Sequence, residues 1–204
     1  MSRGKFITIE GPEGSGKSTH SRLLCAHLRR RGVKVLHTRE PGGTKVGETI
    51  RGILLDKNNK GMSDACELFL FLAARAQIVG EVIRPALARG YTVVCDRFHD
   101  ATVAYQGYGA GLDLKLIEPA GRLATGGLKP DLTILLDVET GLGLRRAGVK
   151  DRMETKSLRF HKRVRQGYLK MAKKEPRRIR VIRTSGSPVA EVQDKIRRVV
   201  SHVV

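Results

Sequence analysis

The chain has 204 residues, 40% of them hydrophobic, which suffices for one domain with a substantial buried core. No run of 18 apolar residues occurs, so we expect no membrane-spanning segment. The net charge of +19 fits nucleic acid as a partner and equally fits small polyanionic ligands such as nucleotides.

The three cysteines, Cys25, Cys66 and Cys95, have neither a pairing pattern nor the spacing of metal ligands. The chain also runs almost directly into its first predicted strand, so we expect no signal peptide. Together these features indicate a cytoplasmic protein with buried, reduced thiols.

The first predicted elements are a short buried strand over residues 5–10, a glycine-rich loop and a helix over 18–31. The loop fits G-x-x-x-x-G-K-[ST], the P-loop pattern, in the strand–loop–helix context that the pattern requires. Its backbone N–H groups, the helix N-terminus and Lys17 would cradle the phosphates of a nucleoside triphosphate, and the Ser18 hydroxyl would reach Mg²⁺. The predicted phosphate-binding residues are Gly11, Pro12, Glu13, Gly14, Ser15, Gly16, Lys17, Ser18 and Thr19.

Further apolar, β-rich runs alternate with helical patterns along the rest of the chain. The strands are expected at 33–37, 91–95, 132–136 and 179–183, and the helices at 46–55, 64–89, 101–106, 112–125, 157–174 and 188–202. This alternation predicts an α/β fold with a parallel sheet and helices on both faces.

Charged and glycine-rich residues follow the predicted strands, at the rim where such folds bind ligands. The segment 38–44 (Thr-Arg-Glu-Pro-Gly-Gly-Thr) follows the second strand, Asp96-Arg97-Phe98 the third, and Asp137 ends the fourth. Arg97 can clamp the phosphate of an acceptor in a bidentate manner, and Asp96 can hold magnesium-bound water or orient Arg97. The rim therefore predicts a second, acceptor site beside the P-loop.

Two other features extend this prediction. The basic stretch 145–152 lies between helices and is suited to close over a triphosphate and exclude water. Phe71 and Arg75 lie four residues apart and so share a helix face, where a ring and a guanidinium could hold a base.

Taken together, these motifs resemble the bacterial-type thymidylate kinases, which are P-loop nucleoside monophosphate kinases, over essentially the whole chain. The motifs that carry the resemblance are Ile9-Glu10-Gly11, the segment 38–44, Ala73-Ala74-Arg75-x-Gln77, Asp96-Arg97-Phe98, Ala104-Tyr105-Gln106-Gly107, Lys129-Pro130-Asp131-Leu132-Thr133 and Asp151-Arg152-x-Glu154. The resemblance implies a P-loop NTPase fold with a five-stranded parallel sheet of order 2-3-1-4-5, as a single domain over 1–204. It also implies transfer of a phosphoryl group from ATP to dTMP, with Mg²⁺ held by Ser18 and Asp96, and a homodimer.

The resemblance implies roles for the acceptor residues as well. Phe71 would stack on the thymine and Arg75 would bond to the base, while Tyr105 would lie under the sugar and select deoxyribose. Arg97 would bind the dTMP phosphate, and Glu13 would lie near the 3′-hydroxyl. The implied acceptor set is Glu13, Arg39, Pro41, Arg51, Phe71, Arg75, Arg97, Thr102, Tyr105 and Gln106.

Some relatives in this family place a catalytic arginine inside the P-loop, and this chain has none there. The resemblance therefore implies a cation from a short lid at about 146–153, acting beside Lys17 and Arg97. Arg146, Lys150 and Arg152 are the candidates, and Arg152 is preferred.

Two alternatives remain open at the level of sequence. One is another kinase of this fold, for dCMP, UMP or a deoxynucleoside. The other is a basic P-loop protein that binds nucleic acid and uses ATP as a switch. The low aromatic content of 4% disfavours the second alternative, so we expect no nucleic-acid partner. The GTPase motif Asn-Lys-x-Asp is absent, because Asn59-Lys60 is followed by Gly61-Met62.

Overall fold

The computed structural model describes residues 3–147 and 151–204. Its sheet has five parallel strands in the order β2-β3-β1-β4-β5, which confirms the predicted fold class and strand order. The strands are β1 (Phe6–Glu10), β2 (Val35–Arg39), β3 (Thr92–Asp96), β4 (Leu132–Asp137) and β5 (Ile179–Arg183).

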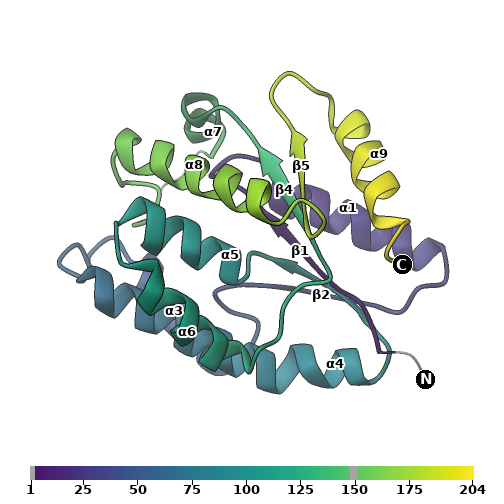
Figure 1. Cartoon of the computed structure of the whole chain (residues 1–204), viewed down its shortest axis with the longest axis horizontal. Helices are drawn as coiled ribbons and strands as arrows, with labels where there is room; N and C mark the ends of the chain where they lie inside the picture. Colours follow the sequence, from purple (N-terminus) through teal and green to yellow (C-terminus); the bar gives the residue numbers. More distant parts are fainter. Residues whose placement is uncertain (1–2, 148–150) are drawn as a thin grey trace.

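Helices cover both faces of the sheet (Figure 1). They are α1 (Lys17–Arg30), α2 (Lys45–Leu55), α3 (Asp64–Ile78), α4 (Arg84–Ala88), α5 (His99–Thr102), α6 (Leu114–Thr125), α7 (Thr140–Ala147), α8 (Leu158–Lys174) and α9 (Val189–Val200). Two π-helical segments, η1 (Val79–Ile83) and η2 (Val103–Gly109), continue α3 and α5. The predicted helix 64–89 is therefore continuous but contains a π turn, and the one predicted at 101–106 extends over 99–109.

The core is divided by the sheet because alternate side chains of a strand point to opposite faces. Ile7 and Ile9 of β1 pack with Leu24 of α1 and Ile196 of α9 on one face. Phe6 of the same strand packs on the other face, with Ile83 and other residues of the α3–α4 region. Strands buried on both faces explain the near-continuous apolar runs of the sequence.

The strand register brings the functional strand ends to one rim. Ile9 lies opposite Asp96, Asp96 lies opposite Arg39, and Glu10 lies opposite Leu135. The P-loop that follows β1 is therefore flanked by the ends of β3 and β4, as the acceptor-site prediction requires.

The sequence analysis missed α7, an eight-residue helix with two glycines. Glu139 caps its start, since its carboxylate accepts from the backbone N–H groups of Gly141 and Leu142 at 2.8 Å each. Gly143 lies against the P-loop so closely that a Cβ there would come 2.4 Å from the carbonyl oxygen of Glu13. The glycines that make α7 hard to predict are thus what allow it to contact the P-loop.

Two of the three free cysteines, Cys25 and Cys95, are buried as expected. Cys66 is exposed in the first turn of α3, so the expectation of three buried thiols is wrong for that residue. Among the described residues, no helix is long and apolar enough to cross a membrane.

Candidate active site

A cavity of about 490 Å³ opens at the rim formed by the ends of β1 and β3. The P-loop contributes one wall, α2 and α3 a second, and α5 and η2 a third, and the cavity is also lined by Arg146, Ala147, Asp151, Met153 and Glu154. Of the predicted residues, those that line it are Glu13, Gly14, Gly16, Lys17, Ser18, Thr19, Pro41, Arg51, Phe71, Arg75, Arg97, Thr102, Tyr105, Gln106 and Arg146.

The P-loop curls around the ammonium group of Lys17. Gly14 and Gly16 adopt positive φ angles of 64° and 89°, a region that favours glycine. Lys17 Nζ donates to the carbonyl oxygens of Gly11 and Pro12 at 3.0 and 2.8 Å. Burial, assisted by the charge of Arg97, lowers the pKa of Lys17 to about 8 against the opposing effect of Glu13. The loop therefore holds a desolvated cation that a phosphate group would stabilise.

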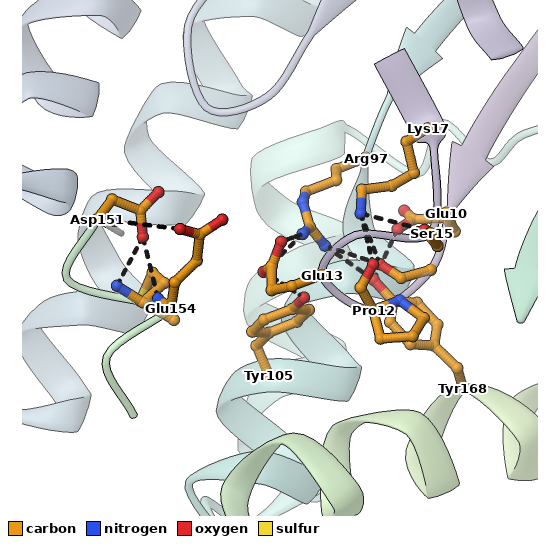
Figure 2. A network of polar contacts seen from close by, with 12 residues as sticks. Glu10, Pro12, Glu13, Ser15, Lys17, Arg97, Tyr105, Asp151, Glu154 and Tyr168 are labelled. Carbon is orange, nitrogen blue, oxygen red and sulfur yellow. Dashed lines mark hydrogen bonds and ion pairs between the residues drawn. The ribbon is translucent and has the colours of Figure 1, made fainter. Parts of the chain in front are cut away.

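Arg97 and Glu13 form the central ion pair of the cavity (Figure 2). Arg97 Nη2 donates to both carboxylate oxygens of Glu13, at 2.8 and 2.9 Å, and Tyr105 Oη donates to Oε1 at 2.7 Å. Burial alone would raise the pKa of Glu13, but the charges of Arg97 and Lys17 and the bond from Tyr105 hold it at about 2. Glu13 is thus a carboxylate, and it occupies the position of an anion on the guanidinium of Arg97.

The backbone of Arg97 is strained, with a φ of 67° in a residue other than glycine. Glu10 stabilises the turn at Arg97, because its carboxylate accepts hydrogen bonds from the N–H of Phe98 at 2.7 Å and from Tyr168 Oη at 2.8 Å. Burial, with the charge of Asp100, raises the pKa of Glu10 to about 7. The sequence analysis assigned no role to Glu10 or Tyr168, although the position of Glu10 at the end of β1 was the available signal.

Arg75 lies at the far wall of the cavity, where its side chain is only 1% exposed. It donates to Glu40 at 2.7 Å, to the hydroxyl of Thr102 at 2.8 Å and to the carbonyl oxygen of Phe98 at 3.0 Å. Burial raises the pKa of Glu40 to about 7 in spite of Arg75. Because a guanidinium has five N–H groups, Arg75 keeps donors for a ligand in the cavity.

Arg51 and Arg39 have different surroundings from those of Arg75. Arg51 lines the cavity and donates to the carbonyl oxygen of Pro41 at 2.9 Å. Arg39 pairs with Glu48 at 3.0 Å and lines a second hollow, with Ser18, His37 and Asp96. The structure therefore does not bring Arg39 together with the other predicted acceptor residues, because β2 turns its side chain toward α2.

Asp96 is buried at the end of β3, beside the first turn of α1. Burial would raise its pKa, but hydrogen bonds with His37, Ser21 and Ser18 lower it. Ser18 and Asp96, the two residues predicted to hold a metal, line the same second hollow. No cluster of three or more acidic, histidine or cysteine ligands occurs in the described part of the chain.

The lid residues have separate positions. Arg146 is exposed and lines the cavity at the end of α7. Arg152 is buried and pairs with Glu67 at 2.7 Å, so the preferred lid cation points into the core rather than into the cavity. The prediction that Arg152 supplies the lid cation is therefore wrong, because a buried, paired arginine is not free to bind a transferring phosphate. Lys150 lies outside the described residues.

Because the P-loop and the Arg97 clamp face one cavity, fold and site together define a P-loop phosphotransferase. Residues 9–196 match the family model described as thymidylate kinase. The chain therefore belongs to the thymidylate kinase family, and the enzyme is a kinase.

Individual relatives agree with this assignment. The chain is 51% identical to the thymidylate kinase of Solidesulfovibrio magneticus, over 91% of this chain and 93% of the relative. It is 48% identical to that of Symbiobacterium thermophilum, over 98% and 94%. The crystal structure of thymidylate kinase from Ehrlichia chaffeensis is similar with a TM-score of 0.81 and 37% identity, covering 98% of this chain and 99% of that one.

Proposed function

We propose that the protein transfers the γ-phosphoryl group of ATP to dTMP, which gives dTDP and ADP. The observation that carries the proposal is the common cavity of Lys17, on the P-loop, and Arg97, at the end of β3. A hydrolase or a switch needs only the first of these cations. A kinase for nucleoside monophosphates needs both, because it must hold a donor and an acceptor phosphate at once.

The donor half of the site is the P-loop. Its amides and Lys17 bind the β- and γ-phosphates of ATP, and the incoming phosphates replace the carbonyl oxygens that Lys17 contacts in this structure. Gly143 brings α7 against the loop, so that Arg146 lies at the edge of the triphosphate site. We assign to Arg146 the cation that stabilises the transferring group.

The acceptor half lies between Arg97 and Arg75. The dTMP phosphate takes the position of Glu13 on the guanidinium of Arg97, and Glu13 turns to the 3′-hydroxyl of the sugar. Phe71 stacks on the thymine, and Arg75 donates to a carbonyl oxygen of the base. Tyr105 packs under the sugar, with its ring 4.8 Å below the guanidinium carbon of Arg97, and excludes a 2′-hydroxyl.

Chemistry in this arrangement needs no general base, because the attacking oxygen of dTMP is already anionic. The protein aligns that oxygen in line with the bond to the leaving group and neutralises the charge around it. The part of the expected lid that lines the cavity, Arg146 and Ala147, helps to exclude water, which would otherwise compete as acceptor.

We further propose Mg²⁺ as the cofactor. Ser18 and Asp96 fit this ion, since a hydroxyl and an ionised carboxylate are hard oxygen ligands. Hydrogen bonds keep Asp96 ionised, which suits it to hold the ion directly or through water. When bound, Mg²⁺ would neutralise part of the charge of the ATP phosphates.

We also infer a homodimer, with the interface on α2, α3 and α6. Large apolar side chains are exposed on all three helices: Val46, Ile53, Phe69, Leu116 and Leu123. Phe69 is 65% exposed and Leu123 85% exposed, which is costly for a monomer. Light scattering after size-exclusion chromatography tests the inference, and Phe69→Glu should shift a dimer toward monomer.

The free thiols favour a reducing compartment, and we propose the cytoplasm.

The reaction is tested by offering dTMP, dUMP, dCMP, UMP and thymidine side by side with ATP and measuring kcat/KM for each. The proposal expects dTMP to be the best acceptor and dTDP to form in proportion to ADP. Preference for another acceptor would replace it with the related kinase that the sequence left open. ADP formation that needs RNA or DNA instead of a nucleotide would favour the switch protein.

A further inference from the structure

Glu67 is a completely buried carboxylate on α3 to which the reaction above assigns no task. Its two oxygens have different partners. Oε1 accepts from the side-chain amide of Gln106 at 2.8 Å, whereas Oε2 faces Arg152 Nη1 at 2.7 Å and Lys156 Nζ at 3.3 Å. Glu67 thus connects Gln106, a residue of the cavity, with Arg152, at the end of the predicted lid, and with Lys156, which follows the lid.

The same geometry fixes which end of the Gln106 amide faces the ligand. Because Gln106 Nε2 is the donor to Oε1, the NH₂ group of Gln106 points to Glu67. The carbonyl oxygen is then the end left for the cavity that Gln106 lines with Phe71 and Thr102. Within residues 3–147 and 151–204 that oxygen has no hydrogen-bond donor of its own.

An acceptor at this position distinguishes pyrimidines by their hydrogen-bond pattern. Thymine presents an N3–H donor beside its O4 acceptor, and cytosine presents an N3 acceptor beside an N4 amino donor. Donors from Arg75 and an acceptor from Gln106 complement thymine and oppose cytosine. With the Gln106 amide reversed, the wall would present two donors and lose this distinction.

We propose that Glu67 is a positioning residue that determines base specificity by fixing the Gln106 amide, and that Arg152 and Lys156 hold the Glu67 side chain in place. The proposal rests on the assignment of the cavity to a pyrimidine nucleotide. Under this proposal Arg152 holds Glu67 in the core and is not the cation of the lid. Arg152 is anchored for this task from α2 as well, because its Nε donates to the carbonyl oxygen of Leu54 at 2.8 Å.

Glu67→Gln tests the proposal with almost no change in volume. The cations Arg152 and Lys156 will attract the amide oxygen of the new side chain, which turns its NH₂ group toward Gln106. Gln106 must then reverse its own amide and present NH₂ to the cavity. We expect the ratio of kcat/KM for dTMP to that for dCMP to fall by about 100-fold, as one hydrogen bond is lost to the first base and one gained by the second.

Glu81→Gln is the matched control, because Glu81 is exposed on η1, accepts a hydrogen bond from Gln77 and does not line the cavity. It should leave the ratio unchanged. A role of Glu67 in stability alone would lower both kcat/KM values together, so an unchanged ratio in Glu67→Gln overturns the proposal. Wild-type activity on dTMP separates this outcome from failure of the proposed function.

A measurement on the wild-type protein covers the case that Glu67→Gln does not fold. The side-chain amide protons of Gln106, assigned by their loss in Gln106→Met, should exchange with solvent far more slowly than those of the exposed Gln166. Exchange of Gln106 as fast as that of Gln166 would show that its NH₂ group is not held by Glu67 and would refute the proposal.

Discussion

The guanidinium of Arg97 grips the carboxylate of Glu13 with one nitrogen at 2.8 and 2.9 Å from its two oxygens. The two residues come from different strand ends, and the contact is only partly exposed to solvent. A carboxylate in this position presents two anionic oxygens to the guanidinium, as the phosphate of the proposed reaction would. The guanidinium that we propose for the acceptor phosphate is therefore neutralised within the protein by Glu13.

Arg97→Lys should lower kcat/KM for dTMP by about 10²-fold, since an ammonium group cannot hold two oxygens in a fixed plane. The Kd for ATP, measured by fluorescence titration, should change little. A variant with normal kcat/KM for dTMP would contradict the assignment of Arg97 to the acceptor phosphate.

Lys17→Ala should reduce kcat by about 10³-fold or more, because the cation at the γ-phosphate is lost. The melting temperature should not fall, since the charge of Lys17 is partly desolvated and its hydrogen bonds are confined to the P-loop. Steady-state kinetics and a thermal melt check the two halves of this expectation. Near-normal turnover would refute the donor site.

The pH dependence of ATP binding should also depend on Lys17. Its pKa of about 8 in the folded protein means that the cation is lost as the pH rises through 8, and the affinity for ATP should weaken by up to about tenfold per pH unit above that. The unfolded chain keeps this proton to about pH 10.5, so between pH 8 and 10.5 the unfolded state binds more protons. This group then stabilises the fold as the pH rises, and the loss of binding is not unfolding.

Calorimetric titration with ATP from pH 7 to 9.5 measures the effect, and Lys17→Ala, which binds weakly, should show no such dependence. A wild-type affinity that stays constant above pH 8 is incompatible with a desolvated lysine at the phosphates.

The two lid candidates should behave differently when replaced. Arg146→Ala should lower kcat by about 10³-fold at unchanged melting temperature, because Arg146 is exposed beside the triphosphate site. Arg152→Ala should instead destabilise the fold by about 3–5 kcal/mol, because it leaves the buried Glu67 without its closest cation. Urea unfolding and steady-state kinetics on both variants show which arginine is catalytic and which is structural. A stable but inactive Arg152→Ala variant would mean that Arg152 is the catalytic cation of the lid.

The strands and the P-loop are open to prediction because they depend on local signals, whereas the order of the strands in the sheet was expected only from the family resemblance. Alternating apolar runs mark the strands, and the glycine pattern marks the loop. The cavity-lining positions of Phe71, Arg75 and Tyr105 were predicted from the resemblance, and their binding roles remain predictions.

Three features escaped prediction because they depend on partners far away in the sequence. The sequence shows that Arg152 is charged, but not that Glu67, on another helix, lies 2.7 Å away in the core. Arg39 is drawn out of the cavity by Glu48, and α7 is held by a cap and a close glycine contact instead of by helix propensity. In each case a tertiary contact, which the local sequence does not reveal, determines where the side chain or helix lies.

A crystal structure with dTMP and a non-hydrolysable ATP analogue tests the central claim most directly. We predict that the dTMP phosphate lies on Arg97 in place of Glu13, that Phe71 stacks on the thymine, and that the γ-phosphate lies on Lys17 in line with the acceptor oxygen. A complex in which Arg97 keeps its contact with Glu13, and in which dTMP binds outside the cavity, would contradict the account.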